Sequence, residues 1–468
     1  MKKYFFILLL VESFCFAAIA QNNTGDIDII APRRHNPAFI APAGTFTIDI
    51  QDTSGISTGR WYVTLKNDIA EWKAQVVSSR YAKVFNDTKD GWRLQIKSPG
   101  NISPELMDVE VTHQSGRKGT VSKALSVVHN MENDFYIFHQ SDQHITSDSA
   151  VEPGGKASKK WGNGSRQALE WITSFYNLTN PRIVFHTGDN MHLYNSAKDW
   201  CGIEEAEKRV KRFFDGTKNY NVPLILATGN HDIGYSDYVD VKEWKQKYNE
   251  LVGQRAFSTR MGSVYVLASE WTNTDYHDWA KKEFNQSFTD PGILFRLQTT
   301  HFFEGAKGWT TIATDSLYPN LVLVGHNHRS RLLQKEPYPV VSVASALDHQ
   351  KAAYYNFTRN QSGWQTTQPL NHSDSTNVFR LSGEYGKPKV YETFEKPNDG
   401  SVRSNTVTIT NELPVDFYNG RVRFLMKRKR YKVNGGEVIA TYNYGKRKKT
   451  VLVQVNIKAN ATSIVSIR

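Results

Sequence analysis

Five apolar segments in the middle of the chain are each followed by polar side chains of the kinds that bind metal ions. The segments are FYIFHQ (135–140), RIVFHT (182–187), LILAT (224–228), ILFRLQTT (293–300) and LVLV (321–324). Short apolar runs of this kind, bounded by Gly and polar residues, predict buried strands. The residues that follow them are Asp142 and His144, then Asp189, then Asn230, His231 and Asp232, then His301, and finally His326 and His328. Because sites in open α/β sheets lie at the carboxyl ends of the strands, we expect one shared pocket.

The donor types in this pocket predict borderline metal ions. Imidazole, carboxylate and amide oxygen, without thiolate, suit zinc, manganese or iron. The donors are too many for one ion, whereas two ions bridged by one carboxylate and a hydroxide would use all of them. Each motif alone is also consistent with an ordinary turn, but their joint occurrence, each behind an apolar strand, favours a metal site.

Taken together, the five blocks resemble the calcineurin-like metallophosphoesterases. That family carries Asp-x-His, Gly-Asp, Gly-Asn-His-Asp/Glu, a single His and Gly-His-x-His in this order, and all five blocks occur between Asp142 and His328. The resemblance implies an α/β fold with a four-layer core, a β-sandwich flanked by helices. This arrangement replaces the open parallel sheet that strand–helix alternation alone suggests.

The resemblance also implies a role for each residue of the blocks. A first metal ion is expected at Asp142, His144, Asp189 and His328. A second is expected at Asp189, Asn230, His301 and His326, with Asp189 bridging the two. His231 is expected to face the substrate off the metals, with Asp232 orienting its ring.

The expected reaction is hydrolysis of a small phosphate ester, either a monoester or a diester. Two cations would neutralise the phosphate oxygens, and a metal-bridging hydroxide would attack phosphorus. His231 would act as the general acid that protonates the departing oxygen.

Three further histidines border the expected site. His192 stands where the purple acid phosphatases, a branch of the superfamily, carry a metal-bound tyrosine, so it is a candidate ligand or phosphate contact. His186 is either a second layer behind the ligands or a core residue, and His139 is expected to be structural. The aromatic side chains of Tyr235, Tyr238 and Trp244 lie in an expected loop. They could stack on the substrate or pack the loop, and packing is favoured.

The two ends of the chain have a different pattern from the middle. Residues 1–20 have the charged start, apolar run and small-x-small end of a secretory signal peptide. Export to the periplasm or the extracellular space is therefore expected, with no transmembrane anchor after cleavage. Residues 21–130 and 371–468 contain short alternating strands and turns that predict β-sandwiches, the first of them immunoglobulin-like. Residues 131–370 form the expected catalytic domain.

Positive charge is concentrated in the last segment. The chain has a formal charge of +12, and from Asn371 onward 18 Lys and Arg stand against 8 Asp and Glu, which gives +10. Solvated strand ends would explain this, as would attraction to an anionic surface or polymer. Two alternatives to a small-ester hydrolase therefore remain at this stage. One is a non-catalytic surface or glycan-binding protein that uses the basic C-terminal β-domain, and the other is a nucleic-acid hydrolase.

Overall fold

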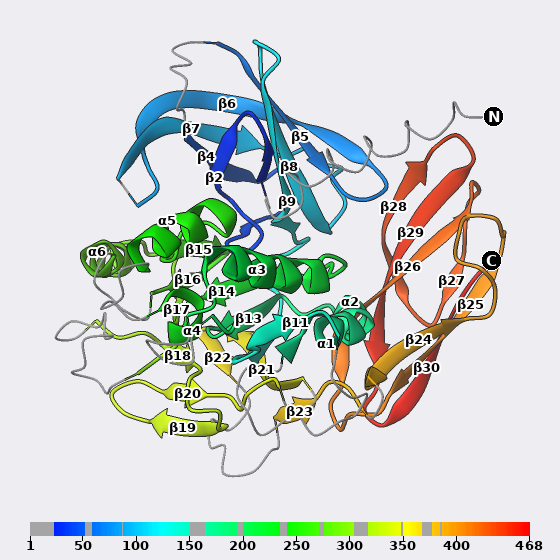
Figure 1. Ribbon diagram of the computed structural model, residues 1–468. Coiled ribbons are helices and arrows are strands. Elements are labelled where there is room, and N and C mark those ends of the chain that lie inside the picture. The colour runs from blue at the N-terminus through cyan, green and yellow to red at the C-terminus, as the bar shows by residue number, and fades with distance from the viewer. Residues whose placement is uncertain are drawn as a thin grey trace, which may run out of the picture.

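The computed structural model describes residues 23–51, 59–86, 88–149, 164–193, 200–234, 241–270, 276–303, 317–347, 350–366, 377–383 and 386–468. Figure 1 shows three bodies: a blue N-terminal β-region, a green and yellow centre with all the labelled helices, and an orange to red C-terminal β-region. The predicted signal peptide, Tyr235 and Tyr238 lie outside the described residues.

The N-terminal region is a sandwich made from one continuous sheet folded on itself. Its strands follow the order β1-β9-β8-β5-β6-β7-β4-β2, and β3 pairs in parallel with β9. The long strand β6 belongs to both layers, because residues 71–74 pair with β5 and residues 75–84 pair with β7. One layer holds β1, β3, β9, β8, β5 and the first part of β6, and the other holds the rest of β6 with β7, β4 and β2. The immunoglobulin-like assignment stays a prediction. The strand bounds are β1 Asn23–Gly25, β2 Asp28–Ala31, β3 Ala38–Ile40, β4 Thr45–Gln51, β5 Trp61–Lys66, β6 Glu71–Val84, β7 Lys89–Lys97, β8 Leu106–His113 and β9 Lys118–Val127.

The centre contains two six-stranded sheets. The first has the order β14-β13-β10-β21-β22, with β23 beside β21, and its strands β10, β13 and β14 run parallel. The second has the order β15-β16-β17-β18-β20-β19. The bounds of the first sheet are β10 Phe135–Gln140, β13 Ile183–Thr187, β14 Leu224–Ala227, β21 Lys351–Asn360, β22 Gly363–Thr366 and β23 Val378–Arg380. Those of the second are β15 Phe257–Met261, β16 Val264–Ala268, β17 Phe295–Thr299, β18 Leu321–Val324, β19 Arg331–Gln334 and β20 Val340–Ser342; β11 (Ile145–Ser147) and β12 (Gly164–Ser165) form a separate pair.

The central strands have apolar side chains on both faces of each sheet, so both faces are buried. In β10, Phe135 and Ile137 enter the core between the two sheets, while Tyr136 and Phe138 enter the core on the outer face. Successive side chains of a strand point to opposite faces, so a fully apolar strand needs a cover on each side. The outer covers are helices, which confirms the expected four-layer core. They are α1 Arg166–Trp171, α2 Thr173–Thr179, α3 Ile203–Thr217 and α5 Val241–Leu251 on the first sheet, α6 His277–Ser287 on the second, and the short α4 Asn230–Ile233 at the site.

One predicted helix is divided in the structure. The segment RQALEWITSFYN (166–177) has helical spacing, which predicts one helix with Ala168, Ile172 and Phe175 on one face and Leu169 alongside. Leu169, Ile172 and Phe175 are buried, whereas Ala168 is half-buried. The backbone leaves helical geometry at Ile172 (φ −97°, ψ 9°), so α1 ends and α2 begins there.

The C-terminal region is a second sandwich, and it shares a core with the centre. Its layers are β24-β25-β30-β27 and β26-β29-β28. Phe417 of β26 lies 6.2 Å from Phe138 and 6.0 Å from Phe175 of α2, measured between ring centroids. The bounds are β24 Val390–Phe394, β25 Asn405–Asn411, β26 Phe417–Lys427, β27 Val433–Asn434, β28 Glu437–Tyr444, β29 Lys448–Ile457 and β30 Ala461–Ile467. Since β23 pairs with β21, the central sheet also extends beyond residue 370.

Buried cations attach the N-terminal sandwich to the centre. Arg33 donates to the Glu250 carbonyl at 3.1 Å and to Asp28 at 2.7 Å, while Arg34 donates to the Thr217 carbonyl. A buried guanidinium needs hydrogen-bond acceptors, so these carbonyl groups fix the position of the segment between β2 and β3 that carries both arginines. In the described part of the chain, no helix is long and apolar enough to cross a membrane.

Candidate metal centre

The structure brings all seven predicted ligands together at the carboxyl ends of five strands. Asp142 and His144 follow β10, Asp189 follows β13, Asn230 follows β14, His301 follows β17, and His326 and His328 follow β18. The first five are buried and the last two are half-buried. Two sheets therefore contribute to one site, and its open side is the side of His326 and His328.

Backbone strain is concentrated at these residues. The described chain has twelve non-glycine residues with positive φ, and five of them are predicted ligands: Asp142 (56°), His144 (47°), Asp189 (50°), His326 (66°) and His328 (51°). Left-handed backbone is costly for residues with a Cβ, and it is retained where the surroundings enforce a functional geometry. The turns after three different strands are thus bent so that their side chains meet.

A first group of donors surrounds Asp142. Its Oδ1 lies 3.1 Å from His328 Nε2 and 3.9 Å from His144 Nε2. The two Nε2 atoms of these histidines lie 3.3 Å apart. Imidazole nitrogens and a carboxylate oxygen that converge in this way form a donor set for a cation.

A second group surrounds Asn230. Its Oδ1 lies 3.1 Å from His301 Nε2 and 3.2 Å from His326 Nδ1, and these two nitrogens are 3.2 Å apart. Nδ1 of His301 lies 2.7 Å from the Thr187 carbonyl oxygen, which leaves Nε2 to face the group. A ligand histidine held at its other nitrogen by a carbonyl is a common arrangement at metal sites.

Asp189 lies between the two groups. Its Oδ2 is 3.1 Å from His301 Nε2 of the second group and 3.9 Å from His144 Nε2 of the first. Its Oδ1 accepts a hydrogen bond from the backbone N–H of His231 at 2.9 Å, which fixes the carboxylate. One carboxylate thus reaches both donor sets.

The electrostatics of the pocket favour bound positive charge. Burial raises the pKa of Asp189, but the neighbouring His301 outweighs burial and holds that pKa below its usual range. Burial lowers the pKa of His301, but Asp189 outweighs it and raises the pKa to about 9. For His144 burial dominates and lowers the pKa to about 3, so this ring is neutral and has a lone pair to offer. Metal ions bind ionised carboxylates and neutral imidazoles, so His144 can bind as it stands, whereas His301 must first release the proton that Asp189 stabilises on it.

Two glycines allow this close approach. A Cβ on Gly229 would lie 2.1 Å from Asp189 Oδ1, and a Cβ on Gly188, whose φ is +92°, would lie 2.5 Å from His301 Nδ1. Only a residue without a side chain fits at either position. The donor chemistry and these contacts together fit metal ions held by the two groups, His144 with Asp142 and His328, and Asp189 with His301 and His326.

Asp232 has a different position from the one predicted. We expected its carboxylate to orient the His231 ring, but its hydrogen bonds run to the backbone N–H groups of Met191 and Gly229, both at 2.8 Å, and to Asn190 Nδ2 at 3.2 Å. Adjacent residues of the short helix α4 project in different directions, so Asp232 acts on His231 through the backbone of the turn. Burial, followed by repulsion from Asp189, raises the pKa of Asp232 to about 7.

His192 contacts both a predicted ligand and the predicted acid. Its Nδ1 lies 2.9 Å from His144 Nδ1, and its ring stacks on His231 with centroids 4.4 Å apart and planes at 17°. His192, His144 and His231 also form a third cluster of possible donor atoms. The sequence signal for this residue was its position three residues after Asp189, in the block that supplies the shared carboxylate.

The other border residues are structural. His139 Nε2 lies 2.9 Å from Thr187 Oγ1, and the buried His186 ring packs edge-on against Phe213 at 5.5 Å. Trp244 lies on α5 rather than on a loop; it is fully buried and donates to the Asp232 carbonyl at 2.8 Å, so it packs in the core.

Comparison with known proteins identifies the same central region. Residues 135–330 match the family model described as calcineurin-like phosphoesterase. No curated protein matches the sequence significantly. Similar solved structures include a proposed 5'-nucleotidase from Staphylococcus aureus (11% identity, 52% of this chain and 55% of that chain, TM-score 0.33). A dimetal phosphatase from Danio rerio is similar over 51% of this chain and 99% of its own (11% identity, TM-score 0.30). The match to the Staphylococcus aureus chain thus spans about half of its length.

Proposed function

We propose that the protein is an exported enzyme that hydrolyses phosphate monoesters or diesters with two metal ions. The match of residues 135–330 to the calcineurin-like phosphoesterase family model supports a metal-dependent phosphoester hydrolase. The observation that carries this proposal is the shared position of Asp189. Its Oδ2 faces His301 at 3.1 Å and His144 at 3.9 Å, so one carboxylate serves two donor groups.

Each donor group would hold one ion. Asp142, His144, Asp189 and His328 would bind the first, and Asp189, Asn230, His301 and His326 the second, with manganese, zinc or iron as the ions that suit these donors. When bound, such ions neutralise phosphate oxygens as Lewis acids and make hydroxide available near neutral pH.

His231 is the residue that we assign as the general acid. Its side chain is 11% exposed at the rim of the site, and its Nε2 lies 4.0 Å from Asp189 Oδ2. The ring is therefore beside the ligands, and its Nε2 is the atom that would protonate the leaving oxygen. Stacking on His192 and the anchoring of the turn by Asp232 hold the ring in place.

Export and attraction to anionic material are the finer parts of the proposal. Export is supported by the signal-peptide pattern of residues 1–20. The C-terminal sandwich contains two basic runs, MKRKRYK (426–432) and GKRKK (445–449). They lie side by side, because the Arg428 N–H donates to the Arg447 carbonyl at 2.8 Å and Lys449 Nζ lies 3.4 Å from the Lys429 carbonyl. This concentrated charge would draw anionic polymers or surfaces toward the enzyme.

A metal-dependent ester assay tests the proposal. The chain is stripped with chelator and reloaded with manganese or zinc, then assayed on p-nitrophenyl phosphate and on bis(p-nitrophenyl) phosphate. We expect turnover of at least one ester, dependent on metal, and at least a 100-fold loss in Asn230→Ala. If the reloaded chain is as inert as Asn230→Ala on both esters, hydrolysis is ruled out as its activity.

A further inference from the structure

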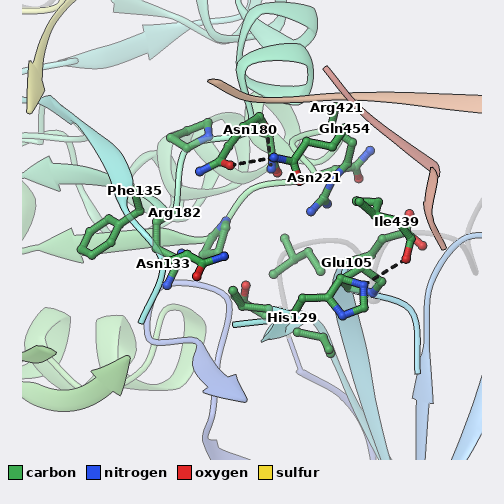
Figure 2. A pocket seen from close by; sticks show the side chains of 18 of the residues that line it. Glu105, His129, Asn133, Phe135, Asn180, Arg182, Asn221, Arg421, Ile439 and Gln454 are labelled. Carbon is green, nitrogen blue, oxygen red and sulfur yellow. Dashed lines mark hydrogen bonds between the residues drawn. The ribbon is translucent and has the colours of Figure 1, made fainter. Parts of the chain in front are cut away.

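A polar cavity lies where the three bodies of the molecule meet. Its volume is about 110 Å³, well above the ~10–15 Å³ that admits one water molecule, so it has room for a group of several heavy atoms. Figure 2 shows Arg421 and Gln454 of the C-terminal sandwich on one side, Phe135 and Arg182 of the centre on another, and Glu105 with His129 from the N-terminal region.

This cavity is separate from the metal centre. It is lined at the amino ends of three parallel strands by Phe135 of β10, by Arg182 just before β13 and by Pro223 just before β14. The metal ligands follow the carboxyl ends of the same strands. At about 3.3 Å per residue, the seven residues from Phe135 to Asp142 put roughly 20 Å between the two places.

The lining contains a cation without an acceptor. The Nε atom of Arg421 is buried, and among the described residues none accepts a hydrogen bond from it. Burial lowers the pKa of Arg421, and the attraction of Glu105 is the main effect that opposes it. Arg421 as a whole is half-buried, but a buried guanidinium N–H that lacks an acceptor is costly, so a bound anion at this point would offset that cost.

The nearby carboxylate of Glu105 is already engaged elsewhere. It pairs with Arg423, and its Oε2 accepts from Ser103 Oγ at 2.7 Å, Tyr442 OH at 2.7 Å and Asn67 Nδ2 at 3.1 Å. Arg423 is in turn held by Asp68 at 2.8 Å. Once these pairs have formed, the positive charge of Arg421 has no carboxylate of its own to pair with among the described residues.

A second guanidinium lines the cavity. Arg182 stacks over the Phe135 ring, 4.8 Å from its centroid, and makes one hydrogen bond of 3.2 Å and one of 3.5 Å to the carbonyls of Met131 and Asn130. The amide side chains of Asn133 and Asn221 also line the cavity and can donate hydrogen bonds. Gln454 lines it too, but its Nε2 already donates to the Tyr418 carbonyl at 3.4 Å and to Asn419 Oδ1 at 3.1 Å.

We propose that this cavity binds a small tetrahedral oxyanion, phosphate or the phosphate group of a small ligand, through Arg421 and Arg182. An anion held here contacts all three bodies at once and stabilises their arrangement. Two guanidinium groups with amide donors are the side chains that recognise phosphate oxygens best.

Calorimetric titration of the full chain with inorganic phosphate tests this site. The protein is treated with chelator so that the metal centre holds no ion, and ionic strength is kept constant. We expect one phosphate per chain, bound at least about tenfold more weakly by Arg421→Gln and unchanged in Arg428→Gln, an exposed arginine of the same sandwich. Absence of binding to the parent, or equal binding by Arg421→Gln, would overturn the proposal.

A second variant keeps the test decisive if Arg421→Gln does not fold. Asn133 is an exposed lining residue, so Asn133→Asp adds a negative charge at the rim without disturbing the interior. We expect it to weaken phosphate binding about tenfold, while Asn443→Asp, at an exposed position outside the lining, leaves binding unchanged. Equal affinity of the two variants would refute the site. A nucleoside monophosphate titrated in parallel shows whether the site takes free phosphate or the phosphate group of a larger ligand. If the nucleotide binds about as tightly as inorganic phosphate, the site accepts a phosphate group on a larger ligand. If inorganic phosphate binds and the nucleotide does not, the site takes the free ion.

Discussion

The carbonyl oxygen of Thr187 lies 2.7 Å from Nδ1 of His301. Because a carbonyl oxygen only accepts, Nδ1 carries the hydrogen, and Nε2 is the nitrogen turned toward Asn230 and Asp189. Thr187, the last residue of β13, therefore sets the tautomer that His301, a predicted ligand after β17 in the other sheet, adopts when its ring is neutral. The site depends on the packing of the two sheets as much as on its own side chains.

The role of His231 predicts a dependence on the leaving group. His231→Gln should reduce kcat about 10²–10⁴-fold for alkyl phosphates, which need a proton on the departing oxygen, and by less than about tenfold for p-nitrophenyl phosphate. The metal content, measured by mass spectrometry, should stay that of the parent, because His231 is not among the seven ligands. An equal loss on both ester types would argue against the assignment.

Gly229 predicts a purely steric effect on the site. Gly229→Ala places a Cβ 2.1 Å from Asp189 Oδ1 and 2.3 Å from the Asp189 nitrogen, so the shared carboxylate must move. We expect at least about a 100-fold drop in kcat/KM and reduced metal content, with an unchanged far-UV spectrum. Gly100→Ala is the control, since its Cβ would meet nothing nearer than 3.9 Å; parent-like metal content in Gly229→Ala would contradict the expectation.

Lys123 predicts how stability changes with pH. Burial, followed by the nearby Arg34, lowers the pKa of Lys123 from 10.5 to about 7. Between these values the unfolded chain binds a proton that the folded chain does not, so the contribution of Lys123 to stability rises with pH from about 7 to 10.5. The Tm of the parent, relative to that of Lys123→Met, should increase by about 2–4 °C from pH 7 to pH 10. The exposed substitution Lys335→Met should show no such trend, and a constant difference between the parent and Lys123→Met would refute the assignment.

The ion pairs of Arg423 connect the two sandwiches and should contribute to the free energy of unfolding. It pairs with Asp68 and with Glu105, which is 3% exposed and lies in the N-terminal sandwich. Arg423→Ala leaves that carboxylate buried without its main partner, and the free energy of unfolding should fall by about 3 kcal/mol. Urea unfolding measures this difference, with Arg430→Ala as an exposed control; a loss as small as that of the control would show that the pair is not needed.

The parts of the site that follow strands were predictable from sequence. An apolar run with polar residues directly behind it determines both the strand and the edge at which the ligands lie, and this held for Asp142, Asp189 and His301. The direction of the Asp232 carboxylate was not predictable, because it depends on the backbone of Met191, a residue from another loop. The same holds for His192, whose role depends on which ring it stacks on.

Contacts between segments far apart in the sequence were equally unpredictable from local patterns. The break between α1 and α2 at Ile172 occurs within a run whose apolar spacing is continuous. The bond between Asn67 and Tyr442, at 3.0 Å, joins residues 375 positions apart, and no local pattern in either segment indicates it. Periodicity reports which face of an element is buried and not what covers it.

The aromatic core around Phe417 means that the catalytic portion is not a self-sufficient unit. A fragment cut to residues 135–330 would lack β21, which lies next to β10 within the sheet, and would present the rings of Tyr136, Phe138 and Phe175 to water. Such a fragment would tend to aggregate rather than fold. A transfer of this domain into another protein would have to include residues 331–468, which supply β21 and the aromatic layer around Phe417.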